Sequence, residues 1–479
     1  MKPSDDDIFL DWHKPRSASF IDELAKRVTD DIESEMTRVK NHDARLYTAK
    51  KFISALFAAY SAVSTKKHQP FVSLSLTTSH YTGHELSYSQ VASVKDALLA
   101  EHLIKVQKGT EYRGRTRIKA VGQLAETFDS HICIWIKQDP VPHEDLLQLK
   151  DTKENKQALL LVDETDDVRV KRDNLFRIND YLIQQCTCLD LPDNELISVA
   201  ASMSKKRLEA KLSNGNKTGW INLHSIQMRR IFNNGSMYQG GRFYGGWWQG
   251  IPSIYRPHIV INGEKTVEID YSSVAIRILY DEAGIELNPD QDLYDLGLSD
   301  WQGKLDPRRT IIKKFLVAKI NDHKNLFRLD EDQQEVLGMN TDQLMSLIRE
   351  KHAPIIDFLE AGNGLSAQYR DSQIAEQVML GMINQDVPIL PIHDSFIVPL
   401  SHKEQLIHAM DMSFRTICAD KADVTVDMPR NIEHFGMSKS EYSDLNLSPE
   451  SLTDTEIVNN PDHSNSRMYK YYQSWLKQQ

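Results

Sequence analysis

The chain has 479 residues, a formal net charge of −11 and a hydrophobic content of 40%. This length predicts two or three domains, and the composition excludes both a globally disordered chain and a uniformly basic nucleic-acid coat. No stretch reaches the roughly 20 apolar residues that a membrane span requires, and the N-terminus lacks the apolar core of a secretory signal. The four cysteines are too few for a disulfide scaffold, so they predict buried thiols in a reducing, cytoplasmic setting.

The N-terminal part of the sequence alternates helical and extended patterns. Apolar spacing and turn residues predict helices over 19–39 and 48–63, a strand within 71–80, a helix that starts near 87, and short strands over 103–106 and 117–121. Ser87 or Ser89 is suited to cap the last of these helices. A helix followed by a two-stranded hairpin resembles a winged helix-turn-helix domain, which we place over 46–130, after a helical segment over 1–45.

The predicted hairpin is strongly basic. Between residues 104 and 119 a single acidic residue, Glu111, stands against Lys105, Lys108, Arg113, Arg115, Arg117 and Lys119. Phosphate groups attract such a cluster, and the release of their counterions favours binding. We therefore expect Arg113, Arg115 and Arg117 to contact nucleic acid. The alternatives are an ordinary charged surface turn and a protein-contact module.

The next segments carry fewer signals. Residues 131–175 are rich in charge and include prolines, so they predict a linker that is interrupted by the apolar run 158–162. Residues 176–235 have a helical pattern. The last segment, 438–479, is polar and acidic, with one helix predicted at its end that could dock through aromatic side chains.

Two aspartates follow apolar strands in the C-terminal half. The run from 258 to 272 predicts a hairpin with its turn at Asn262-Gly263, and its second strand ends at Asp270 before a helix begins. The run from 386 to 400 predicts two apolar strands around Asp394. Two carboxylates from separate strands can lie side by side only if something neutralises them, and Mg²⁺ together with phosphate oxygens is suited to that role.

A basic helix is predicted between these two stretches, over 306–321. Arg309 and Lys313 are four residues apart, so they share one face of this helix. Arginine can bind phosphate with two parallel hydrogen bonds and lysine as a point charge. The pair is therefore suited to hold a triphosphate.

In this order, the segments from 238 to 428 resemble the polymerase domain of family A DNA polymerases and the single-subunit RNA polymerases of phages and mitochondria. The residues that carry the resemblance are the GGRFYGGWWQGIP segment, IDYSSVAIR, PRRTIIK and PIHDSF. The resemblance implies an α+β right-hand fold: a palm with an antiparallel sheet, helical fingers and a reduced thumb, preceded by the winged-helix domain. The palm and fingers would span 236–437, and the thumb-like region 176–235.

The resemblance also implies roles for individual residues. Asp270 and Asp394 match the catalytic, metal-binding aspartates of a two-Mg²⁺ site, with Mn²⁺ as the alternative ion. The positions implied near the nucleotide are Arg309, Lys313, Tyr271, Ala275 and Asn321. The positions implied near nucleic acid are Arg242, Gln249, Arg277 and His393.

Three departures from the family pattern concern the sugar. The motif around Asp394 reads His-Asp-Ser, the form usual in the RNA polymerases. Ala275 and Asn321 replace a glutamate and a tyrosine of the DNA polymerases, which removes bulk and predicts that ribonucleotides are not sterically rejected. Asp270-Tyr-Ser and Arg277, in contrast, are more like the DNA polymerases, so DNA and RNA both remain open as the product.

The sequence thus predicts a template-directed nucleic-acid polymerase without a proofreading exonuclease, because the first 235 residues lack a convincing Asp-x-Glu strand. Its partners would be template and primer, expected to be DNA, and nucleoside triphosphates, with no membrane. Oligomeric state stays open. The alternatives are a primase-like or terminal-transferase enzyme on the same palm, and a DNA-binding replication initiator or regulator with an inactive palm. A polymerase fused to a DNA-binding domain would suit a mobile element or a defence system.

Overall fold

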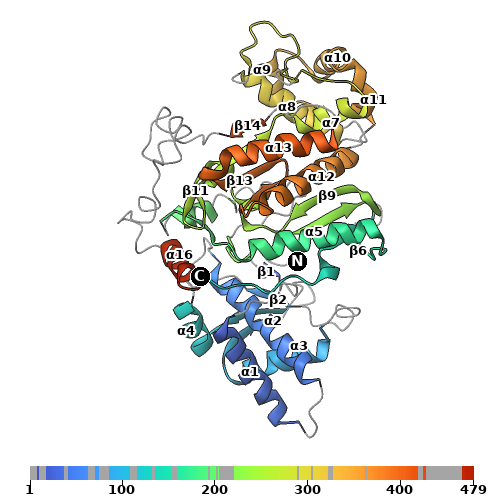
Figure 1. Cartoon of the computed structure of the whole chain (residues 1–479). Helices are drawn as coiled ribbons and strands as arrows, with labels where there is room; N and C mark the ends of the chain where they lie inside the picture. Colours follow the sequence, from blue (N-terminus) through green and yellow to red (C-terminus); the bar gives the residue numbers. More distant parts are fainter. Residues whose placement is uncertain are drawn as a thin grey trace.

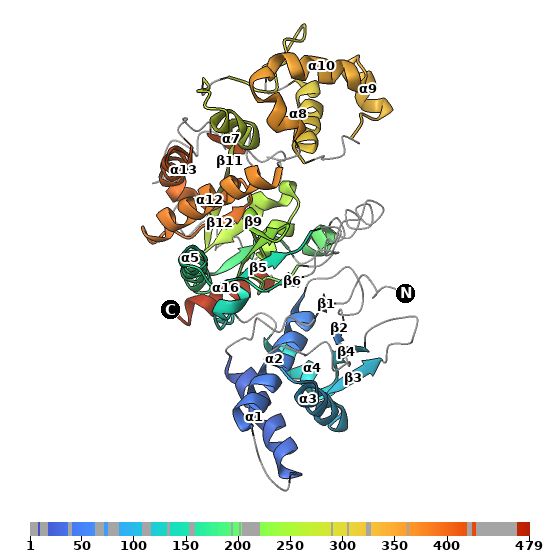
Figure 2. The ribbon, with the colours of Figure 1, turned by 90° about the vertical axis from the view of Figure 1, so that its right-hand side faces the viewer.

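Two hydrophobic cores organise the chain, one in an N-terminal unit and one in the larger remainder (Figure 1, Figure 2). The smaller core runs from Phe20 to Ile136, and the larger from Trp135 to Tyr471. The computed structural model describes residues 8–9, 18–36, 41–62, 71–74, 86–107, 116–131, 135–152, 159–192, 195–200, 203, 221–288, 291–303, 306–321, 327–361, 364–418, 424–427 and 467–479.

Helices and a four-stranded sheet form the N-terminal unit. The helices are α1 (Ser19–Ser34), α2 (His42–Ser61), α3 (Tyr88–Ala100) and α4 (Gly122–His131). The sheet has the order β1 (Ile8–Phe9), β2 (Val72–Leu74), β4 (Thr116–Ala120), β3 (Ile104–Gln107). Of the two candidate caps, Ser87 caps α3, because its side chain accepts the Gln90 N–H in a capping box. The expected boundary at residue 45 falls inside α2, and Phe20 of α1 packs in the same core as α2, so α1 belongs to this unit.

The β3–β4 hairpin carries part of the basic cluster. Lys105 lies directly opposite Lys119, and Arg117 lies opposite Gln107. The predicted strands are thus present within one or two residues of their expected bounds. Arg113 and Arg115 lie outside the described residues.

An antiparallel six-stranded sheet lies at the centre of the larger unit. Its order is β12 (Leu390–Ile392), β13 (Ser395–Pro399), β11 (Glu264–Tyr271), β10 (Ile259–Ile261), β7 (Thr187–Leu189), with β14 (Val424–Asp427) also paired to β11. The β10–β11 turn has Asn262 at φ 53° and Gly263 at φ 86°, the left-handed conformation that the Asn-Gly pair predicts. The helix α13 (Lys403–Ile417) packs on this sheet, and α12 (Gly364–Ile383) packs against α13 and against α7 (Val274–Glu282), as Figure 1 shows. The predicted mixed α+β character is confirmed.

A third sheet corrects two predictions about the middle of the chain. Its order is β6 (Leu159–Leu160), β5 (Leu147–Lys150), β8 (Arg229–Asn233), β9 (Ser236–Tyr244), and it packs beside α5 (Asp166–Leu182). The segment 131–175, expected to be a linker, instead supplies β5, β6 and the start of α5. The apolar side chains that alternate along β5, Leu147 and Leu149, are buried, which outweighs the charge around them. The segment 176–235, expected to be helical, contributes β7 and β8 as well as the end of α5.

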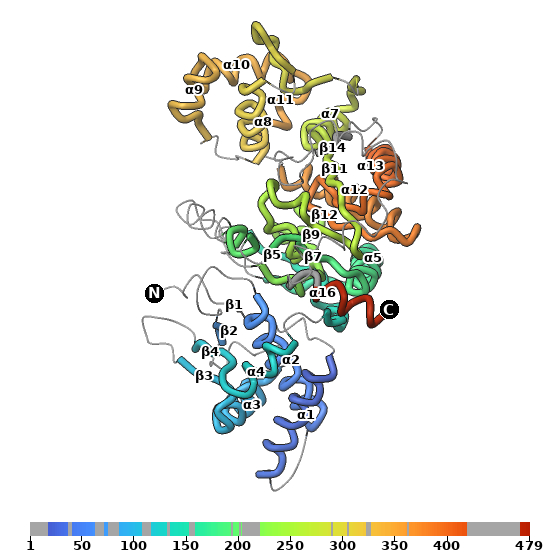
Figure 3. The backbone as a smooth tube through the Cα atoms, turned by 90° about the vertical axis from the view of Figure 1, so that its left-hand side faces the viewer, coloured from blue at the N-terminus to red at the C-terminus, as the bar shows by residue number. Residues whose placement is uncertain are grey.

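A helical lobe extends from the other end of the large sheet. It consists of α8 (Pro307–Ile320), α9 (Glu331–Leu337), α10 (Thr341–Lys351) and α11 (Ile356–Glu360). Figure 3 shows this lobe and the N-terminal unit at opposite ends, with the large sheet between them. The lobe occupies the place in the chain where helical fingers were expected.

The C-terminal helix α16 (Arg467–Leu476) docks against the larger unit through aromatic side chains, as predicted. Tyr471 is buried in the large core, and the Trp475 indole N–H donates to the Gln184 carbonyl oxygen across 3.1 Å. Cys186, Cys188 and Cys418 are buried thiols, in line with the prediction. None of the helices among the described residues combines the length and apolarity that crossing a membrane requires.

Candidate functional site

The structure brings Asp270, near the end of β11, next to Asp394, which lies in the turn just before β13. Asp270 of β11 lies directly opposite Ser395 of β13, the residue that follows Asp394. The main-chain N–H of Tyr271 also donates to the Asp394 carbonyl oxygen across 3.3 Å. Opposed residues of antiparallel strands have Cα atoms about 5 Å apart, so the two acidic residues lie close together. Both side chains are half-buried.

Local contacts fix the backbone on both sides of this pair. His393 has φ 59°, which allows the tight turn between β12 and β13, and Ser273 has φ 57°, which turns the chain from β11 into α7. The Ser395 hydroxyl donates to Glu268 across 2.7 Å, and Glu268 also pairs with Arg256 at 2.7 Å. Ser395, the last residue of the His-Asp-Ser motif, therefore ties β13 to β11 beside the two aspartates.

Tyr294 belongs to the same site, although the sequence reasoning missed it. Its side chain is buried, and burial is the largest cause that raises its pKa. A hydrogen bond with Ser273 and the charge of Arg309 act in the opposite direction, while the charges of Asp394 and Asp270 raise the pKa further. Tyr294 therefore lies within the electrostatic field of both aspartates and of the basic helix. The one sequence signal that could have pointed to Tyr294 was its position in a loop of apolar and acidic residues just before the basic helix.

The basic helix α8 presents Arg309 at this site. The Arg309 Nε donates to the Asp292 carboxylate across 3.0 Å, and the guanidinium lies 4.8 Å from the centre of the Tyr294 ring. Lys313, one turn further along, is exposed to solvent. Ile312, Phe315 and Leu316 of the same helix are buried. Arg309, whose side chain is 16% exposed, therefore lies at the edge of the buried face of α8, while Lys313 faces solvent.

Arg242 of β9 reaches a second buried carboxylate, Asp371 of α12. The two side chains are joined at 2.7 Å. Burial, together with the charge of Asp394, raises the pKa of Asp371 to about 6, against the lowering effect of Arg242. Burial lowers the pKa of Arg242, but the nearby charges of Asp371 and Asp394 outweigh it and raise the pKa above its usual value. The sequence reasoning assigned Arg242 but not Asp371, because the partners come from distant elements.

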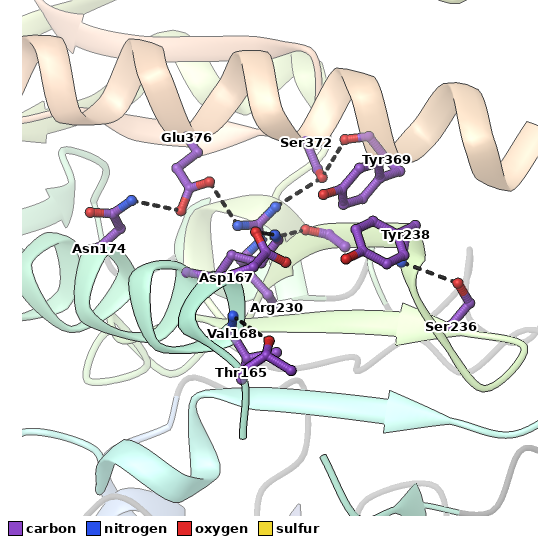
Figure 4. Close-up of polar contacts among 12 residues, drawn as sticks. Thr165, Asp167, Val168, Asn174, Arg230, Ser236, Tyr238, Tyr369, Ser372 and Glu376 are labelled. Atoms are coloured by element: carbon purple, nitrogen blue, oxygen red, sulfur yellow. Dashed lines mark hydrogen bonds and ion pairs between the residues drawn. The ribbon is translucent and has the colours of Figure 1, made fainter. Parts of the chain in front are cut away.

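A buried network locks β8 and β9 onto α12, as Figure 4 shows. Arg230 donates to the Gly241 carbonyl oxygen (2.9 Å), to Glu376 (2.8 Å) and to the Ser372 hydroxyl (3.1 Å). A Cβ at Gly241 would lie 2.7 Å from the Phe232 ring and 2.9 Å from Ser372, so only glycine permits this approach. Gly241 and Ser372 are the chain neighbours of Arg242 and Asp371, so the network also fixes the position of that pair.

Other predicted nucleic-acid contacts lie inside the fold. Arg277 is only 1% exposed, and its Nε donates to the Ser272 carbonyl oxygen across 3.3 Å. Gln249 is half-buried and joins the GGR segment to the sheet, since it donates to the Phe243 and Pro391 carbonyl oxygens across 3.0 and 3.2 Å. Both residues hold the fold together in this structure rather than facing solvent.

The three remaining nucleotide positions and His393 have distinct settings. The Tyr271 side chain is buried and donates its hydroxyl proton to the Met410 carbonyl oxygen (2.6 Å), so only its main chain is available to the site. Ala275 lies half-buried in the first turn of α7. Asn321 ends α8, where it is exposed and accepts a hydrogen bond from Gln368 (3.2 Å). The His393 ring packs edge-on against Tyr244, at 5.4 Å between the centres.

The acidic pair suits some metals and not others. Within the part of the chain that the structure describes, no three or more His, Cys, Asp or Glu side chains form a metal-binding group. A zinc site, which takes three or four protein ligands, does not fit this donor set. Mg²⁺ fits it, because this ion is commonly held by one or two carboxylates together with water and substrate phosphates.

Comparison with known proteins finds similarity among solved structures. No protein-family model and no curated protein matches the chain. Among solved structures, the chain is similar to the POL domain of Pol1 from M. smegmatis in complex with DNA primer-template and dNTP, with 12% sequence identity and a TM-score of 0.30. The match covers 86% of this chain and 66% of that chain, which is slightly less than two thirds of its length. A score this low does not establish a common fold, so the function proposed below depends on the residues of this chain.

Proposed function

We propose that this protein is a template-directed nucleotidyltransferase that extends a primed nucleic-acid strand with nucleoside triphosphates. The observation that carries the proposal is that Asp270 on β11 lies beside Asp394 in the turn before β13. Both lie within the electrostatic reach of Tyr294 and, through it, of Arg309 on the basic helix. Carboxylates and a cationic helix face in one site suit a reaction that moves a highly charged phosphoryl group.

Each group would have a separate part in the reaction. Asp270, Asp394 and the main chain of Tyr271 would hold Mg²⁺, which when bound lowers the pKa of the attacking 3′-hydroxyl and neutralises charge on the phosphates. Arg309 would donate hydrogen bonds to the triphosphate, and Lys313 would add a positive charge one helical turn away. Tyr294 would exclude water between these cations and the acidic pair.

The proposed site places little steric restriction on the sugar of the nucleotide. Ala275 has no side chain long enough to contact a 2′-hydroxyl, and Asn321 is already engaged with Gln368 at the end of α8. These features support acceptance of ribonucleotides. Comparing the incorporation of ribonucleotides and deoxyribonucleotides tests this, and strict use of deoxyribonucleotides would contradict it.

Two surfaces are proposed to bind the nucleic acid. The first is Arg242, beside Asp394, with His393 and the half-exposed Tyr244 next to it. The second is the β3–β4 hairpin of a winged-helix-like domain, where Lys105 faces Lys119. Like charges directly opposite on a sheet destabilise it, so their presence favours a surface that meets phosphates. Arg117 would belong to the same surface, together with Arg113 and Arg115.

The test is nucleotide incorporation on primed DNA and RNA templates, with Mg²⁺ and with each nucleotide set. Asp270→Ala and Asp394→Ala should each lower the rate by at least about a thousandfold. Glu335→Ala, which removes an exposed carboxylate from α9, is the matched control and should keep the rate. Equal rates in all four proteins would overturn the proposal.

The alternative functions make different predictions in the same assay. A primase-like enzyme would incorporate nucleotides without a primer, and a terminal transferase would do so without a template. A replication initiator or regulator with an inactive palm is supported by the basic hairpin, and it would bind DNA without any incorporation.

A further inference from the structure

A short segment between α7 and α8 is fixed at three successive residues. Asp292 pairs with Arg309 of the helical lobe at 3.0 Å. The Leu293 carbonyl oxygen lies 3.0 Å from Nε2 of His352, which is also in the lobe. Tyr294 forms a hydrogen bond with Ser273 of the sheet unit. Because each residue is bound by a different element, the segment cannot shift without breaking contacts on both sides.

The Asp292 carboxylate is held by both of its oxygens. Oδ1 accepts the main-chain N–H of Tyr294 across 3.1 Å, and Oδ2 accepts the Nε–H of Arg309 across 3.0 Å. The first bond fixes the rotation of the carboxylate, so the second fixes the direction of the guanidinium. Both side chains are less than one fifth exposed, at 18% and 16%, which limits screening by water.

Asp292 contacts the guanidinium of Arg309 at Nε, the nitrogen nearest the aliphatic part of the side chain. This group is planar and carries five N–H donors, one on Nε and four on the terminal nitrogens. The ion pair with Asp292 is made by Nε, and the Tyr294 ring lies 4.8 Å from the guanidinium carbon. A carboxylate that competed with the triphosphate for Arg309 would bind the terminal nitrogens of the guanidinium, because phosphate oxygens bind these nitrogens in parallel pairs. The contact at Nε instead holds the guanidinium in place and leaves its terminal nitrogens available to the phosphates.

From this geometry we propose that Asp292 is a positioning residue for nucleotide binding: it orients Arg309 so that the terminal nitrogens face the phosphates. The inference rests on the proposed function and extends it to a residue that does not touch the substrate. Arginine has many rotamers, and ordering one such side chain on binding weakens affinity by a factor of about three to ten. Asp292 removes that penalty by ordering Arg309 in advance.

The test is a double-mutant cycle on the full chain. Asp292→Asn keeps the shape of the side chain but leaves one carbonyl oxygen for two donors. We expect it to raise the KM for the nucleotide by about three- to tenfold while kcat stays within about twofold. In the Arg309→Ala background the same substitution should have no further effect, because its target is gone. An equal effect in both backgrounds, or an unchanged or lower KM in the Asp292→Asn protein, would overturn the inference.

The control is Asp295→Asn, which removes the same charge from the same segment. Asp295 accepts the Gly297 N–H across 2.9 Å in a local turn, so its substitution should leave KM unchanged. A rise in KM equal to that of Asp292→Asn would show a general effect of charge and would sink the inference. The melting temperature of each variant shows whether a change in KM reflects a loss of folded structure.

Calorimetric binding of inorganic tripolyphosphate separates this inference from the proposed function. If the wild type incorporates no nucleotide but binds tripolyphosphate, and both Asp292→Asn and Arg309→Ala weaken that binding, the polymerase assignment fails and the inference stands. If the wild type is active and Asp292→Asn changes neither KM nor tripolyphosphate affinity, the inference fails alone. Absence of both incorporation and binding would refute both.

Discussion

Arg242 and the buried carboxylate of Asp371 are joined at 2.7 Å although 129 residues separate them in the chain. The pair connects β9 to α12, next to Asp394. An ion pair buried to this extent is costly unless its geometry is well fixed, and here the Arg230 network supplies that geometry through the neighbouring residues. The protonation state of Asp371 should therefore affect the free energy of unfolding.

The first prediction concerns pH and Asp371. Its pKa in the folded protein is about 6, above the ordinary value of 3.8, so the folded state binds a proton more tightly than the unfolded state. The stabilising contribution is therefore complete below about pH 4 and is lost as pH rises through 6. Asp371→Asn should remove this dependence, which reaches about 1.4 kcal/mol per pH unit. Urea unfolding of both proteins between pH 4 and 7 measures it; parallel curves would contradict the prediction.

His352 should give a pH dependence of the opposite sign. Burial lowers its pKa from 6.5 to about 4, and its ring bonds with Tyr280 at 3.0 Å. The unfolded chain takes up this proton more readily, so stability is complete above about pH 6.5 and is lost as pH falls toward 4. His352→Gln should flatten this part of the stability curve, though it also lowers overall stability. A wild-type slope that survives the substitution would point to other groups.

The acidic pair should be destabilising without metal. Two half-buried carboxylates on adjacent strands repel each other, so Asp270→Asn should raise the melting temperature by a few degrees, corresponding to about 1 kcal/mol, while it abolishes incorporation. Differential scanning calorimetry without divalent ions tests the stability, with Glu335→Gln on the exposed face of α9 as the control. A lower melting temperature for Asp270→Asn would mean that the carboxylate is held by favourable contacts instead.

Gly241 should be intolerant of any side chain. It has φ 75°, and an added Cβ would lie 2.7 Å from the Phe232 ring. Gly241→Ala should therefore lower the free energy of unfolding by about 2–4 kcal/mol, the sum of backbone strain and steric overlap. Gly297→Ala is the matched control, because Gly297 has φ 76° with no atom within 4 Å of the added Cβ, so only about 1 kcal/mol of strain remains. Equal losses in chemical denaturation would show that packing around Gly241 has no role.

Local chemistry along the sequence determined several elements of this protein. The Asn262-Gly263 turn and the Ser87 cap depend on residues within a few positions of each other. Their φ preferences and capping hydrogen bonds can be read without knowledge of the rest of the chain. The same is true of the strands that end beside Asp270 and Asp394.

Only the tertiary structure decided which distant residues meet. The pairing of Arg242 with Asp371 and of Arg309 with Asp292, and the position of Tyr294 close to Arg309 and to the aspartates, depend on how helices pack on a sheet. The sequence did not predict β5 for the same reason. The charged residues around it are typical of a linker, and its pairing with β8 exists only in the folded structure. Burial and electrostatic coupling arise between elements, and no local pattern contains them.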